Sequence, residues 1–119
     1  MTQKISLLAL SIVATAALAA ERFVNANGAY PTARQGAIGV TTTTAAVGAL
    51  VATDVLGTSI VTAGAAFAKG TPLAVGTSGK AVAAQANDVI VATAMQASTA
   101  DGNRVEVFLI PNATPATGS

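Results

Sequence analysis

The chain has 119 residues, which is enough for one domain with a modest core. Hydrophobic residues make up 52% of it, aromatic residues 3% and charged residues 9%, and the net charge is +1. There is no histidine, no cysteine and no basic run, which excludes disulfides, thiolate metal sites, the commonest catalytic base and the electrostatic footprint of a nucleic-acid-binding protein.

The first predicted element is an uncharged, apolar stretch at residues 5–20, between Lys4 and the pair Glu21-Arg22. Its basic start and its small residues at 17–19 are the pattern of a secretory signal peptide. It is too short to cross a membrane as a helix, which takes about 20 apolar residues. Because it runs directly into strand-forming residues, we interpret it as a retained part of the fold. Its alanines favour a helix, whereas its β-branched residues at 11–15 allow a strand.

Downstream, short runs rich in Val, Ile and Thr alternate with glycine turns. Strands of this length with such regular turn signals are typical of a β-barrel or β-sandwich. We therefore predict an all-β domain with an extended N-terminal segment and at most one short helix, at 42–52. The expected strands are 37–40, 50–53, 58–63, 71–75, 80–84, 88–97 and 104–110.

The last of these strands alternates as a half-buried strand does. Val105, Val107 and Leu109 are expected to face the core. The opposite row also ends apolar, with Phe108 and Ile110, so we expect that face to be covered as well. The turns are chemically consistent, since Gly79 and Gly102 stand where hairpins need a positive φ. Gly70 forms a turn before Pro72, which begins a strand, where a missing N–H is tolerated.

No motif in the chain supports catalysis. Residues 75–81 resemble a phosphate-binding loop, but Ala74 and Ala81 stand where that motif needs Gly and Ser or Thr, so a hairpin turn is favoured. Nothing places Asp101 and Glu106 across a cleft as paired carboxylates. Serine has no histidine to activate it. We predict that the chain is not an enzyme and has no catalytic, cofactor-binding or metal-binding residues.

Two longer runs, 57–84 and 88–111, resemble the capsid decoration (cement) proteins of tailed bacteriophages. The resemblance extends upstream through 14–33 and 36–43, and it rests on the order and spacing of elements that are individually common. Ala92 departs from the pattern, because the family usually has Gly there. The matching elements are Ala63–Phe67, Gly70, Gly79-Lys80, Ile90–Ala97, Ala100–Gly102 and Val105–Ile110.

This resemblance implies a β-barrel-like domain on the outer surface of an icosahedral phage head, made in the cytoplasm of the bacterial host. The implied role is to clamp neighbouring subunits of the major capsid protein. The implied assembly is a homotrimer at three-fold and local three-fold positions. No cofactor, nucleic acid, membrane or small-molecule ligand is implied. Such cementing needs apolar contact surface and no reactive side chains, as this composition provides.

We expect an N-terminal apolar segment at 1–20, a β-rich decoration domain at 21–111 and an extended tail at 112–119. Because the uncharged N-terminal run is too apolar to lie free in water, we expect it to contact the shell or a neighbouring subunit. The candidate interface residues are Ile5, Leu7, Leu8, Leu10, Ile12 and Val13.

An alternative remains open on the sequence. The chain would then be a secreted or periplasmic β-domain, an adhesive or surface-layer module, with a signal peptide removed at 1–19. The intact mass of the native protein distinguishes the two readings.

Overall fold

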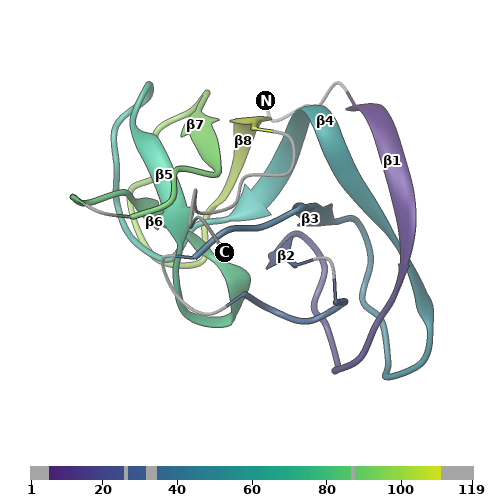
Figure 1. Cartoon of the computed structure of the whole chain (residues 1–119). Helices are drawn as coiled ribbons and strands as arrows, with labels where there is room; N and C mark the ends of the chain where they lie inside the picture. The colour runs from purple at the N-terminus through teal and green to yellow at the C-terminus, as the bar shows by residue number, and fades with distance from the viewer. Residues whose placement is uncertain (1–5, 26, 32–34, 87, 111–119) are drawn as a thin grey trace.

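A computed structural model gives the structure of the protein at residues 6–25, 27–31, 35–86 and 88–110. These residues form an all-β fold, as predicted, with eight strands in one sheet and one short helical turn, η1 (Thr77–Gly79) (Figure 1). The strands are β1 (Ser6–Val13), β2 (Phe23–Val24), β3 (Gly39–Thr41), β4 (Leu50–Thr62), β5 (Pro72–Val75), β6 (Ala81–Ala83), β7 (Ala92–Ala94) and β8 (Arg104–Leu109).

Most of the sheet curls into a nearly closed barrel. Its strands follow the order β4-β8-β7-β5-β6, and every neighbouring pair is antiparallel. A parallel bridge from Ala63, just after β4, to Ala81 of β6 completes the circuit. There the Gly64 N–H donates to the Ala81 carbonyl at 2.7 Å. The barrel is filled by small and medium side chains, chiefly Val61, Leu73, Val75, Ala92, Ala94, Val105, Val107 and Leu109.

The predicted alternation and turns of the barrel are confirmed. Val105, Val107 and Leu109 are buried inside it. Gly79 has a φ of +75° and Gly102 a φ of +94°, a region that glycine enters without steric cost. Pro72 is the first residue of β5, so its missing N–H interrupts nothing in the middle of a ladder.

Strand β4 joins the barrel to the rest of the fold. The predicted strands 50–53 and 58–63 are parts of this one strand, which bends at Gly57, where φ is +96°. The half before the bend lies between β1 and β3, and the half after it pairs with β8. The bend therefore lets one strand serve two parts of the sheet.

The N-terminal segment is a strand and not a helix. β1 pairs antiparallel with β4, and the two form a ribbon that extends beside the barrel (Figure 1). The residues after β1 run beneath this ribbon and enclose a second small core. Its buried members are Ala14, Leu18, Val24, Ala45 and Val51, with Ile12, Tyr30 and Ile38 packed against them.

The one helix allowed by the sequence, at 42–52, is absent from the structure. These residues form a bridge at Ala45 to Leu18, a turn at 47–48 and the start of β4. Tertiary pairing overrides the helical preference of alanine in both places, because helix propensity is a weak determinant compared with pairing across the sheet. Residue 5 and the predicted tail at 112–119 lie outside the described residues.

Candidate functional site

The far end of the β1–β4 ribbon presents apolar side chains to solvent. Val47 and Leu50 are each 68% exposed, and Val13 is 53% exposed. Val13 stands directly opposite Leu50 in the β1–β4 register, so both side chains lie on the same face. The turn that carries Val47 connects to the same strand end. We call Val13, Val47 and Leu50 the ribbon end.

Backbone hydrogen bonds fix the ribbon end in place. Gly48 adopts a φ of +86°, which closes the turn. Its N–H donates to the Ala14 carbonyl at 2.7 Å, and the Ala14 N–H donates to the Ala49 carbonyl at 2.8 Å. The apolar side chains are therefore held outward by the chain path and cannot fold back onto the core. Grouped apolar side chains exposed in this way are a candidate contact site.

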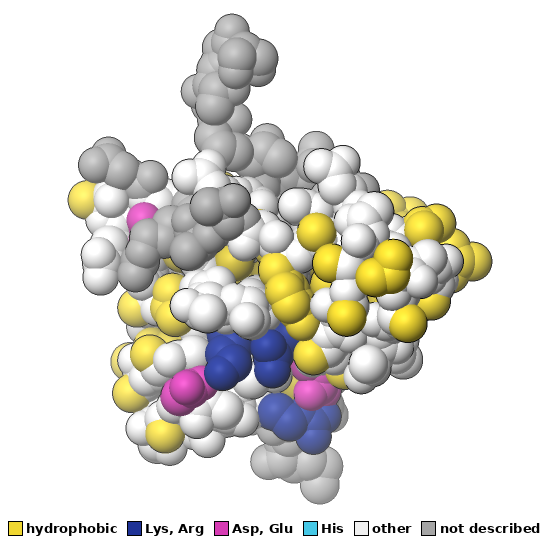
Figure 2. All heavy atoms as spheres, turned by 90° about the horizontal axis from the view of Figure 1, so that it is seen from below, with side chains coloured by type: hydrophobic (Ala, Val, Ile, Leu, Met, Phe, Trp, Pro, Cys, Tyr) yellow, Lys and Arg dark blue, Asp and Glu magenta, His cyan; other side chains and the backbone are white. Residues whose placement is uncertain are grey.

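The ribbon carries no charge near this end. No residue at 5–20 or 35–53 is charged. Charged side chains gather elsewhere, in the ion pairs Lys80–Asp101, at 3.0 Å, and Arg104–Glu21. Figure 2 shows them beside the hydrophobic group at its right, not within it. Glu21 raises the pKa of Arg104, first through their hydrogen bond and then through its charge. The ribbon end is thus uncharged, and the ion pairs lie beside the apolar group.

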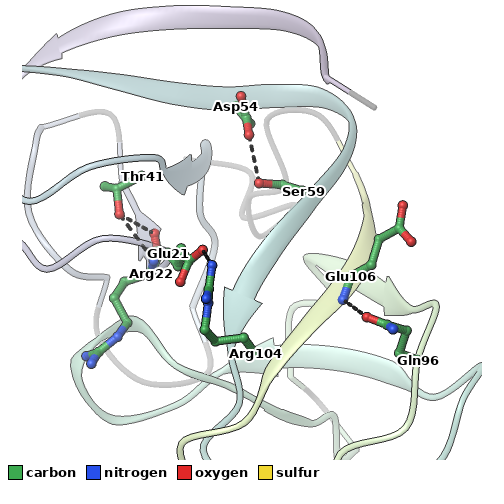
Figure 3. A network of polar contacts seen from close by, with 8 residues as sticks. All are labelled: Glu21, Arg22, Thr41, Asp54, Ser59, Gln96, Arg104 and Glu106. Atoms are coloured by element: carbon green, nitrogen blue, oxygen red, sulfur yellow. Dashed lines mark hydrogen bonds and ion pairs between the residues drawn. The ribbon is translucent and has the colours of Figure 1, made fainter. Parts of the chain in front are cut away.

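Polar contacts lie where the ribbon joins the rest of the fold (Figure 3). In the bend of β4, the buried Ser59 hydroxyl donates to the Asp54 carboxyl at 2.8 Å. Beneath the ribbon, the buried Thr41 hydroxyl donates to the Ala19 carbonyl at 2.8 Å and accepts from the Arg22 N–H at 3.1 Å. Buried hydrogen bonds of this kind hold a strand corner in one geometry. They tie the ribbon to the barrel.

The predicted interface residues differ in their exposure to solvent. Leu10, at 42% exposure, and Val13 are open to solvent, whereas Ile12 packs against the second core. Leu7 and Leu8 lie on β1, and Ile5 lies outside the described residues. Sequence reasoning missed Val47 and Leu50, because the segment 42–52 read as a helix. One feature of the sequence could have indicated an exposed turn here, namely Gly48 between apolar residues in an uncharged stretch.

A second apolar group lies on the outside of the barrel. Phe108 is 54% exposed, Ile90 44%, Met95 41% and Ile110 40%. Phe108 pairs with Thr93 across β7 and with Thr58 across β4, so Met95 and Ile60 are its diagonal neighbours. The sequence predicted that this face would be covered, and the single chain leaves it open. We call Ile60, Met95, Phe108 and Ile110 the barrel face.

The described part of the chain was found to have neither a cavity nor a cluster of metal-ligating side chains, that is, a group of three acidic, histidine or cysteine side chains. Among the same residues no helix is both long and apolar enough to span a membrane. The two exposed apolar surfaces, the ribbon end and the barrel face, are therefore the candidate functional sites.

Comparison with known proteins agrees with a contact role. The family described as phage cement protein matches residues 3–109. No curated protein sequence matches the chain. Among solved structures, the head fiber gp8.5 N base of bacteriophage phi29 is similar in fold, with a TM-score of 0.73 and 18% sequence identity over 92% of this chain and 98% of that one. Since the family match spans nearly the whole of the described fold, the chain belongs to the phage cement protein family.

Proposed function

We propose that the chain is a structural protein of the phage particle that binds the outer surface of the shell and clamps neighbouring major capsid protein subunits. The observation that supports this role best is the exposed, uncharged and apolar ribbon end in a member of the phage cement protein family. The protein is made in the host cytoplasm and acts on the virion. It acts by contact alone, without catalysis.

The energetics suit a protein that acts in many copies. Burying an exposed Val or Leu side chain contributes about 1.5–3 kcal/mol. Three such side chains at the ribbon end contribute several kcal/mol, part of which offsets the entropy lost on association. One copy therefore binds moderately. Because a protein that binds only the assembled shell stabilises it by mass action, many copies together strengthen the particle.

The ribbon end can be tested with a single charge. Val47→Asp places a carboxylate where the shell would desolvate it without a partner, and unpaired buried charges are costly. We expect retention on purified heads that lack the protein to fall by at least about tenfold, which corresponds to about 1.4 kcal/mol. Co-sedimentation with the heads over a range of protein concentrations measures this.

The matched control is Ala68→Asp, which adds the same charge at an exposed position on the barrel. It should bind as the unaltered chain does. Circular dichroism confirms that both variants are folded. Equal binding of Val47→Asp and Ala68→Asp to the heads would show that the ribbon end is not part of the interface with the shell.

We also propose that three copies associate through the barrel face, so that each trimer spans neighbouring shell subunits at three-fold and local three-fold positions. The support is the exposure of Phe108 among other apolar side chains on a regular sheet surface. We expect the unaltered chain to sediment at three times its chain mass and Phe108→Ser to sediment as a monomer. Identical masses for the two proteins would contradict this role of the barrel face.

A further inference from the structure

The outer edge of β1 has no partner strand. β1 pairs with β4 alone, and β4 is paired on its other side with β3. No backbone hydrogen bond joins the outer side of β1 to another described residue. An unpaired strand edge presents a row of N–H and C=O groups that can pair with another chain.

The register shows which backbone groups face outward. The Thr42 N–H donates to the Ala52 carbonyl, so the Ala52 backbone points toward β3 and away from β1. In an antiparallel pair, the backbone groups of the residue opposite then point the other way, toward the open edge. That residue is Ser11. By the same alternation the backbone groups of Ala9 and the N–H of Val13 also face outward, whereas Leu10 and Ile12 bond to β4. The Val13 carbonyl lies against Gly28.

This edge lacks the features that usually prevent strand addition. Edge strands are normally short, charged, interrupted by proline or covered. β1 has eight residues, and none is charged or proline. The other edge strands of the described sheet are protected from pairing: β2 has only two residues, and β6 is bridged to Ala63. In the described fold β1 is therefore the one long edge open to pairing.

We infer that the outer edge of β1 accepts an extended segment of the shell protein as an added strand. This inference rests on the proposed function, because it takes the shell as the partner. Val13 lies where the two surfaces meet: its side chain is part of the ribbon end, and its N–H is the last outward group of the edge, because its carbonyl lies against Gly28. A partner that covers the ribbon end is therefore next to the edge.

The edge defines the chemistry of its ligand. The outward groups from Ala9 to the Val13 N–H match an extended segment of about four residues, at about 3.4 Å per residue. The outer face there carries the small side chains of Ala9 and Ser11, both exposed. They leave room for larger side chains on the added strand. Backbone hydrogen bonds give affinity in such pairing, and alternate side chains give specificity.

Ser11→Pro tests the inference directly. Proline removes the Ser11 N–H that faces the open edge and leaves the bonds between β1 and β4 intact, so an edge strand tolerates it. We expect an unchanged melting curve, an unchanged sedimenting mass and at least a tenfold loss of binding to purified heads. Should this variant unfold, Ser11→Lys decides by the same criteria, because a charge on the edge opposes strand addition.

Each other outcome overturns the inference. If Ser11→Pro binds heads like the unaltered chain, the edge accepts no strand. The proposed function is then still tested independently by the binding of Val47→Asp to heads. If Ser11→Pro changes the sedimenting mass of the free protein, the edge pairs with a second copy. If the unaltered chain itself does not bind heads, the proposed function is wrong, and so is the inference that a segment of the shell protein adds to β1.

Discussion

A chain that begins at Ala20 is expected not to fold. This shortening removes all of β1 and, from the second core, the buried residues Ala14 and Leu18. Replacing one buried Leu by Ala costs about 2–5 kcal/mol, and the whole stability of a small domain is about 5–15 kcal/mol. Loss of a strand and of two core residues exceeds that margin.

Loss of the first strand would also expose β4. The first half of β4 would become an open edge, and the bridge from Leu18 to Ala45 would disappear. Far-UV circular dichroism and a thermal melt measure the outcome. A cooperative melt of residues 20–119 at the temperature of the full chain would show that the ribbon is dispensable, as a cleaved signal peptide is. The intact mass of the protein from native particles tests the same question independently.

Gly28→Ala is expected to be strongly destabilising. Gly28 has a φ of +82°, and a Cβ atom there would lie 2.0 Å from the Val13 carbonyl oxygen. Backbone atoms cannot rotate out of the way, so the segment beneath the ribbon must shift. We expect a loss of at least about 3 kcal/mol in the free energy of unfolding, measured with urea, from strain and overpacking together.

Gly102→Ala is the matched control for this effect. Gly102 has a φ of +94°, but nothing lies within 4 Å of the position its Cβ would take. It therefore carries the backbone strain without the clash, about 1–2 kcal/mol. The difference between the two variants isolates the close approach of residue 28 to β1. Equal losses of unfolding free energy in the two variants would mean that the ribbon moves away from residue 28 at little cost.

The barrel strands could be predicted from the sequence because their signals are local. Val, Ile and Thr runs end at glycine turns, and the alternation in β8 shows which face is buried. The long strand β4 could not be predicted as one element. Its continuity through Gly57 depends on partners distant in sequence, namely β1 and β8, and on the contact between Asp54 and Ser59.

The candidate site was predictable in part for the same reason. The lack of charge at the N-terminus pointed to Leu10 and Val13, and both are exposed. Ile12 was included because an apolar run does not show which of its residues face inward until its partner strand is known. Val47 and Leu50 were missed because alanine-rich residues at 42–52 favour a helix locally, and only pairing with β1 makes them a turn and a strand.

The central claim is that this chain binds a phage shell with its ribbon end inward. A cryo-EM reconstruction of heads saturated with the protein tests it most directly. We predict density for the barrel on the outer surface, with Val47 and Leu50 against the shell, the Lys80–Asp101 side toward solvent, and contacts to more than one shell subunit. Undecorated heads, or a barrel whose ionic side faces the shell, would contradict the account.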